Sequence, residues 1–205
     1  MTGLLVDTST WWHWFSLLTG QSFCNSEQEA EAVAFGRLYG HLLQQKDSHP
    51  FLYNARVLLE LPENLRAEFD RLVKPYARFI PIPLSRTDGA YQFDGSIMMG
   101  GRMGGSLSCL LNMDGYAHEE KLLEAANSGK HRYLYEAKVR RREFDVEHLE
   151  SALEAGASHF VTTDTIRIKI IMKAASLWPE SKPVVDAARI CCLPSTALAA
   201  FTGVA

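Results

Sequence analysis

The sequence lacks the features that mark several common protein classes. Its four cysteines form no Cys-x-x-Cys pair, which favours reduced thiols over a disulfide scaffold or a zinc site. No apolar run approaches membrane-spanning length, and the opening residues, MTGLLVD, carry neither a charged leader nor a signal-length apolar segment. The net charge of −3 excludes a wholly basic nucleic-acid coat but allows a local basic patch. These absences predict a soluble, cytoplasmic protein without membrane association.

What the sequence does contain is a series of short apolar runs that alternate with helical patterns. GLLVD, PFLYN and SHFVTTD are typical of buried strands, and KPVVDAARICCLPSTAL indicates a closing strand, a proline stop and a short helix. Strands that alternate with helices predict an α/β fold with a central, mostly parallel sheet flanked by helices. We expect residues 1–205 to form a single domain, because this length can bury one sizeable core.

A central segment at about 85–142 differs in composition from the rest. It holds eight of the 14 glycines and four of the six methionines. Its GGRMGG stretch is not followed by the Gly-Lys-Ser/Thr of a nucleotide phosphate loop, which argues against that kind of site. We therefore expect an atypical insertion, rich in glycine and methionine, within the single domain.

Two aspartates follow predicted strands directly. Asp7 ends the first apolar run and Asp164 ends the run that begins at His159. Ligands of parallel sheets bind beyond the carboxyl ends of the strands, so both side chains should emerge at one rim. The alternative is that each aspartate only caps the helix that follows it.

Two further acids are expected at the same rim. A helix over 145–155 would span about 16 Å, and a strand over 159–163 would return a similar distance, which brings Asp145 close to Asp164. Glu60 follows the short strand at Phe51–Tyr53 by about two helical turns. The alternatives are a helix cap at Asp145 and a solvated helix residue at Glu60.

Clustered carboxylates predict a cation. Without one they repel one another and take up protons. Oxygen ligands without cysteine or histidine favour Mg²⁺ or Mn²⁺ over zinc, and a bound ion of this kind can activate a water. A phosphodiester suits such a site because its anionic oxygens complete the coordination shell.

Several stretches of the chain resemble the PIN-domain nucleases. These are LLVDTST, FLYNARVLLEL and above all DVEHLESALEAGASHFVTTD, which is similar to the family's pattern of an Asp that opens a helix, an Ala-rich stretch, a Gly turn and a strand reading hydrophobic–Thr–x–Asp. The tail ARICCLPSTAL looks like the family's closing strand, proline and short helix. The resemblance covers about residues 1–83 and 143–201 and leaves out the insertion.

The resemblance implies a PIN-like three-layer fold and hydrolysis of RNA through a water activated by Mg²⁺ or Mn²⁺. The catalytic and metal-binding residues that it implies are Asp7, Glu60, Asp145 and Asp164. It also implies Ser9 and Thr162 as supporting hydroxyls.

A basic run, KVRRR, precedes Asp145 directly, where it could follow a phosphate backbone toward the acids. The alternative is a solvated helix face. The candidate nucleic-acid-binding residues are Lys138, Arg140, Arg141, Arg142, Arg167 and Lys169.

Three classes of function stay open. The first is a metal-dependent ribonuclease acting on RNA or single-stranded DNA, either a toxin with an antitoxin-like partner or a processing or defence enzyme. The second is a catalytically inactive PIN-fold module that binds nucleic acid or protein. The third is another phosphoryl enzyme, although a haloacid-dehalogenase-like phosphatase would need an Asp where Ser9 stands. A homodimer contact through Trp12 is also open.

Overall fold

The computed structural model describes residues 3–21, 25–45, 49–81, 148–177, 179 and 182–203. The predicted insertion at 85–142 lies outside them. In chain order the elements are β1 (Leu4–Val6), α1 (Thr8–Leu18), α2 (Ser26–Gln44), β2 (Phe51–Tyr53), α3 (Ala55–Glu60), α4 (Glu63–Leu72), the 3-10 turn η1 (Lys74–Tyr76), β3 (Ala77–Phe79), β4 (His159–Val161), α8 (Thr165–Leu177), α9 (Lys182–Ile190), β5 (Cys191–Cys192) and α10 (Pro194–Thr202). A further helical segment covers residues 148–154.

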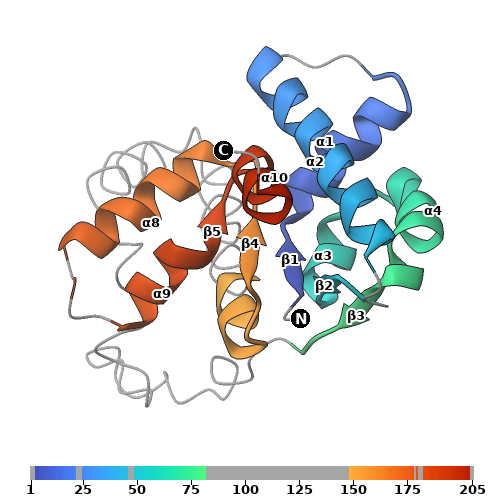
Figure 1. The fold of residues 1–205 in the computed structure, drawn as a ribbon. Helices are drawn as coiled ribbons and strands as arrows, with labels where there is room; N and C mark the ends of the chain where they lie inside the picture. The colour runs from blue at the N-terminus through green and yellow to red at the C-terminus, as the bar shows by residue number, and fades with distance from the viewer. Residues whose placement is uncertain are drawn as a thin grey trace, which may run out of the picture.

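The strands form a five-stranded sheet in the order β3-β2-β1-β4-β5, and every neighbouring pair is parallel (Figure 1). The chain moves outward from β1 to β3, returns to β4 beside β1, and then moves outward to β5. The direction of winding therefore reverses between β1 and β4, which is where open parallel sheets bind ligands. The predicted α/β class, with a parallel sheet flanked by helices, is confirmed.

Two separate cores cover the two faces of the sheet. Leu4 and Val6 of β1 point into one core, and Leu5 points into the other, as the alternation of a strand requires. Helices α1, α2, α4 and α10 pack on the first face. Helices α8 and α9 and the 148–154 segment pack on the second. The sheet is thus the middle of three layers (Figure 1).

The first core is aromatic and anchors α1. Trp11 is fully buried, and its ring centroid lies 5.0 Å from that of Phe35, 5.7 Å from Phe51 and 5.6 Å from Phe69. Tilted and edge-on aromatic pairs of this kind add to the free energy gained by burial. They hold the first turn of α1 against the sheet, next to the end of β1.

The closing segment differs from the sequence expectation. Its strand is limited to Cys191–Cys192, and residues 182–190 form α9 instead. The two described cysteines, Cys191 and Cys192, are free thiols, and burial raises the pKa of each to about 12. Among the described helices, none is both long and apolar enough to cross a bilayer.

Candidate active site

Asp7 lies at the reversal point of the sheet, between β1 and α1. Asp7 is only 2% exposed to solvent. It occupies the N-cap position of α1, but its side chain makes no capping hydrogen bond. Its backbone N–H donates to the carbonyl oxygen of Val161 at 2.9 Å, which ties it to the end of β4. The carboxylate therefore contacts side chains from several elements of the fold.

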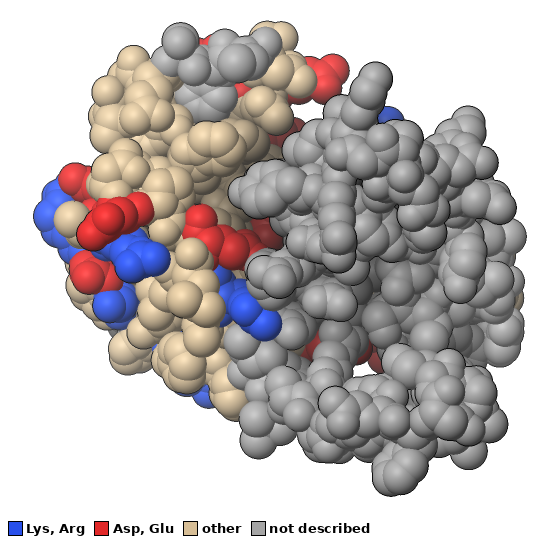
Figure 2. All heavy atoms as spheres, turned by 180° about the vertical axis from the view of Figure 1, so that it is seen from behind, with Lys and Arg blue, Asp and Glu red and all other residues tan. Residues whose placement is uncertain are grey.

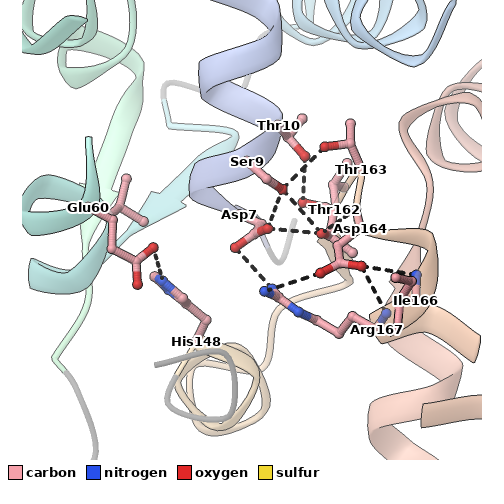
Figure 3. A network of polar contacts seen from close by, with 12 residues as sticks. Asp7, Ser9, Thr10, Glu60, His148, Thr162, Thr163, Asp164, Ile166 and Arg167 are labelled. Atoms are coloured by element: carbon pink, nitrogen blue, oxygen red, sulfur yellow. Dashed lines mark hydrogen bonds and ion pairs between the residues drawn. The ribbon is translucent and has the colours of Figure 1, made fainter. Parts of the chain in front are cut away.

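The two carboxylate oxygens of Asp7 have different partners (Figure 3). Oδ2 accepts hydrogen bonds from Ser9 Oγ at 2.5 Å and from Thr162 Oγ1 at 2.9 Å. Oδ1 lies 3.1 Å from Nη1 of Arg167. The residues named as supporting hydroxyls from the sequence therefore contact Asp7 directly, and an arginine of α8 neutralises it.

The electrostatics of this contact keep Asp7 ionised. Burial raises the pKa of Asp7. Arg167, His148 and the two hydroxyl hydrogen bonds together lower it by more than burial raises it, so that the pKa is about 2. Asp7 is therefore a carboxylate at neutral pH. A buried ionised carboxylate needs a positive partner, because the protein interior solvates charge poorly.

Asp164 follows β4 and serves two purposes at once. Its Oδ1 accepts the backbone N–H groups of Ile166 and Arg167, each at 3.0 Å, and so caps α8. Its Oδ2 lies 4.0 Å from Nη2 of Arg167. The capping alternative is therefore realised at Asp164, while its second oxygen faces the same guanidinium as Asp7 (Figure 3).

Glu60 approaches from the β2 side of the rim. It is the last residue of α3, and its Oε2 lies 3.3 Å from Nε2 of the fully buried His148. His148 also contributes to the lowered pKa of Asp7, so it lies near both acids. Asn54 secures this arrangement: it caps α3 and donates to Ser151 Oγ at 3.2 Å, which joins α3 to the 148–154 segment.

A chain of hydroxyl groups leads from Asp7 toward His13. Thr163 Oγ1 donates to Ser9 Oγ at 3.2 Å, and His13 Nδ1 lies 2.8 Å from Thr163 Oγ1. Partial burial lowers the pKa of His13, although the charge of Asp7 opposes this. From the sequence, His13 and His148 were interpreted as lone surface or core histidines and were not assigned to the site. A signal for His13 was present, because it stands four residues after Ser9 and so shares its helix face.

The remaining predicted site residues have different outcomes. Asp145, Lys138 and the arginines at 140–142 lie outside the described residues. Lys169 is exposed on α8. Arg167 points toward Asp7, with only 11% of its side chain exposed. On the face shown in Figure 2, the basic and acidic side chains of the described residues are interspersed.

The donors at the rim suit a divalent ion in their chemistry. Within the described ranges, no group of three or more His, Cys, Asp or Glu residues is arranged to hold a metal. However, Asp7 Oδ1 and Asp164 Oδ2 face one positive group, the guanidinium of Arg167. The guanidinium thus lies where two carboxylate oxygens face one positive charge. Hard oxygen ligands of this kind suit Mg²⁺ or Mn²⁺.

Comparison of the chain with family models, with curated proteins and with solved structures found no match.

Proposed function

We propose that the protein is a PIN-like, Mg²⁺- or Mn²⁺-dependent nuclease that hydrolyses RNA phosphodiesters. The observation that carries this proposal is that Asp7 Oδ1 and Asp164 Oδ2 both face the guanidinium of Arg167. They do so at the point where the winding of the parallel sheet reverses. The three-layer arrangement also supports the finer assignment to a PIN-like fold, with residues 85–142 as its insertion. We also assign Glu60 to the site as a third carboxylate; on the β2 side its Oε2 lies 3.3 Å from Nε2 of His148.

The chain's own residues prepare each carboxylate to bind a cation through one oxygen. Ser9 and Thr162 occupy Oδ2 of Asp7, and the first turn of α8 occupies Oδ1 of Asp164. Because Asp7 is already ionised at neutral pH, it releases no proton on binding. Asp7, Asp164, Glu60 and Asp145 would hold the ion, which would supply an activated water when bound.

The inactive binding module is the second candidate, and a specific contact favours it. The ion pair between Arg167 and Asp7 neutralises the buried charge without a metal. If Arg167 stays paired with Asp7 permanently, the acids at the rim only stabilise the fold, as expected for a catalytically inactive binding module. Activity measurements separate the two candidates.

The direct test is Asp164→Asn. Asn caps helices about as well as Asp, so α8 keeps its cap while the rim loses a charge. We expect Mn²⁺-dependent cleavage of a panel of single-stranded RNAs to fall on the order of 100-fold. Asp70→Asn is a matched control, because this acid lies on α4, more than half exposed and paired with Lys74. Unchanged cleavage by the Asp164 variant would retire the proposal.

Binding of RNA is tested separately by neutralising the arginines at 140–142 with glutamine. Each lost phosphate contact on a single strand reduces the salt dependence of binding by about 0.7 in log–log slope, so the slope should fall by roughly 2. The control replaces the exposed Arg66, Arg71 and Arg78. Equal affinity and slope in both triple variants would assign the run to a solvated face.

A further inference from the structure

We propose that Arg167 is an internal cation that competes with the divalent metal for Asp7 and Asp164, so that metal binding requires its guanidinium to leave. This inference rests on the proposed function, because the metal is the competitor. It adds a regulatory role: Arg167 sets the metal concentration at which the site fills.

The competition follows from the oxygens that are involved. Nη1 of Arg167 lies 3.1 Å from Asp7 Oδ1, and Nη2 lies 4.0 Å from Asp164 Oδ2. The other oxygen of each carboxylate is already held by hydroxyls or by backbone N–H groups. Mg²⁺ binds its oxygen ligands at about 2.0–2.1 Å. It would therefore need the same two oxygens and the same space, and the two positive groups would also repel each other.

The position of Arg167 in α8 favours release of its guanidinium. Arg167 is the third residue of the helix, where the helix dipole disfavours a positive charge. Its guanidinium carbon also lies 5.9 Å from the centroid of the Phe160 ring. The two carboxylates thus offset an unfavourable helix position. A metal that takes both carboxylates removes the contacts of the guanidinium with Asp7 and Asp164 and leaves its contact with Phe160.

The same geometry protects the metal-free fold. Asp7 is buried and ionised, so it needs a positive partner in either state. Arg167 is that partner in this structure, and the metal would replace it. By linkage, removal of Arg167 should destabilise the metal-free protein and increase the stabilisation that metal provides. A merely structural Arg167 would instead lower stability equally with and without metal.

The experiment measures Mn²⁺ affinity by titration calorimetry, and melting temperature in EDTA and in Mn²⁺, for the full chain and for Arg167→Gln. We expect Mn²⁺ to bind Arg167→Gln about tenfold more tightly than the wild type, within the usual range of coupling between two ligands. The variant should melt at a lower temperature in EDTA and gain more than the wild type on addition of Mn²⁺. Arg189→Gln is the control, because the side chain of Arg189 is 76% exposed on α9 and pairs with Asp186 of the same helix.

Two further variants keep the outcomes distinct. Arg167→Lys retains a positive charge and should bind Mn²⁺ with an affinity between those of wild type and Arg167→Gln; it also serves if Arg167→Gln does not fold in EDTA. If Asp7→Asn abolishes Mn²⁺ binding but the Arg167 variants bind like the wild type, the competition is overturned and the metal site stands. If no variant shows Asp7-dependent Mn²⁺ binding, both proposals are overturned.

Discussion

Asp7 and Asp164 follow neighbouring parallel strands, yet the two carboxylates have different surroundings. Asp7 is buried, and its carboxylate contacts the side chains of Ser9, Thr162 and Arg167. Asp164 has a side chain that is 37% exposed and caps α8 through backbone N–H groups. Equivalent strand ends thus produce different chemistry. The buried charge of Asp7 needs a counter-ion if the fold is to be stable. The charge of Asp164 is stabilised mainly by the backbone N–H groups of the helix that it caps.

The largest expected effect separates the two acids by stability. Asp7→Asn should lower the free energy of unfolding by about 3 kcal/mol, because Arg167 then loses a buried carboxylate partner. Asp164→Asn should change it by only a few tenths of a kcal/mol, roughly, since Asn is an equally good N-cap. Urea unfolding of both variants measures the difference. Equal losses would show that burial does not distinguish these acids.

Acid titration provides a second comparison. The pKa of Asp7 is lowered from 3.8 to about 2 on folding, so its contribution is complete above the unfolded value and disappears as the pH falls through the folded one. Between pH 4 and pH 2 the wild type should therefore lose about 2 kcal/mol that Asp7→Asn does not lose. Unfolding curves of both proteins across this range measure it. A gap between them that does not change with pH would contradict the assignment.

The two oxygens of Asp164 can be separated by substitution. Asp164→Ala removes the cap of α8 and should cost about 1 kcal/mol of unfolding free energy. Asp164→Asn should keep that stability, while both variants lose the carboxylate that faces the cation site. Paired measurements of melting temperature and Mn²⁺ affinity test this. Loss of stability in both variants to the same extent would mean that capping is not the structural role of Asp164.

The smallest expected effect on stability is at Glu60, the third carboxylate. Its side chain is 26% exposed, and Gln could still contact His148 Nε2. Glu60→Gln should change the free energy of unfolding by less than about 0.5 kcal/mol. Its Mn²⁺ affinity should nevertheless fall by about tenfold. Unaltered affinity would remove Glu60 from the metal site and leave it as a partner of His148.

Much of the fold could be predicted from the sequence, because buried strands in a parallel sheet are short, continuous apolar runs. Phe51–Tyr53 and the start of β4 at His159 were found in this way. Helix α9 was not, because the β-branched pair Val184 and Val185 is typical of strands. In the structure Val184 and Ala187 instead reach the second core at helical spacing, so packing overrides local preference.

The site was only partly predictable, because tertiary contacts that no local pattern encodes also decide its geometry. Asp7 and Asp164 could be found because each ends an apolar run of the sequence; Asp7 follows β1 directly, and Asp164 follows the end of β4 at Val161 by three residues. The contact of His13 with Thr163 joins residues 150 positions apart, and no local pattern encodes it. Arg167 was interpreted as an RNA contact, which stays a prediction; in the structure its guanidinium pairs with Asp7, since helix side chains lean toward the N-terminus. Asp145 stays a prediction.

The most direct test of the central claim is a Mn²⁺ soak of crystals, with the metal located by its anomalous signal. The account predicts a Mn²⁺ ion bound to both Asp7 and Asp164, with the Arg167 guanidinium moved away from them. A fully occupied Mn²⁺ site elsewhere, with the Arg167 ion pair to Asp7 intact, would contradict it.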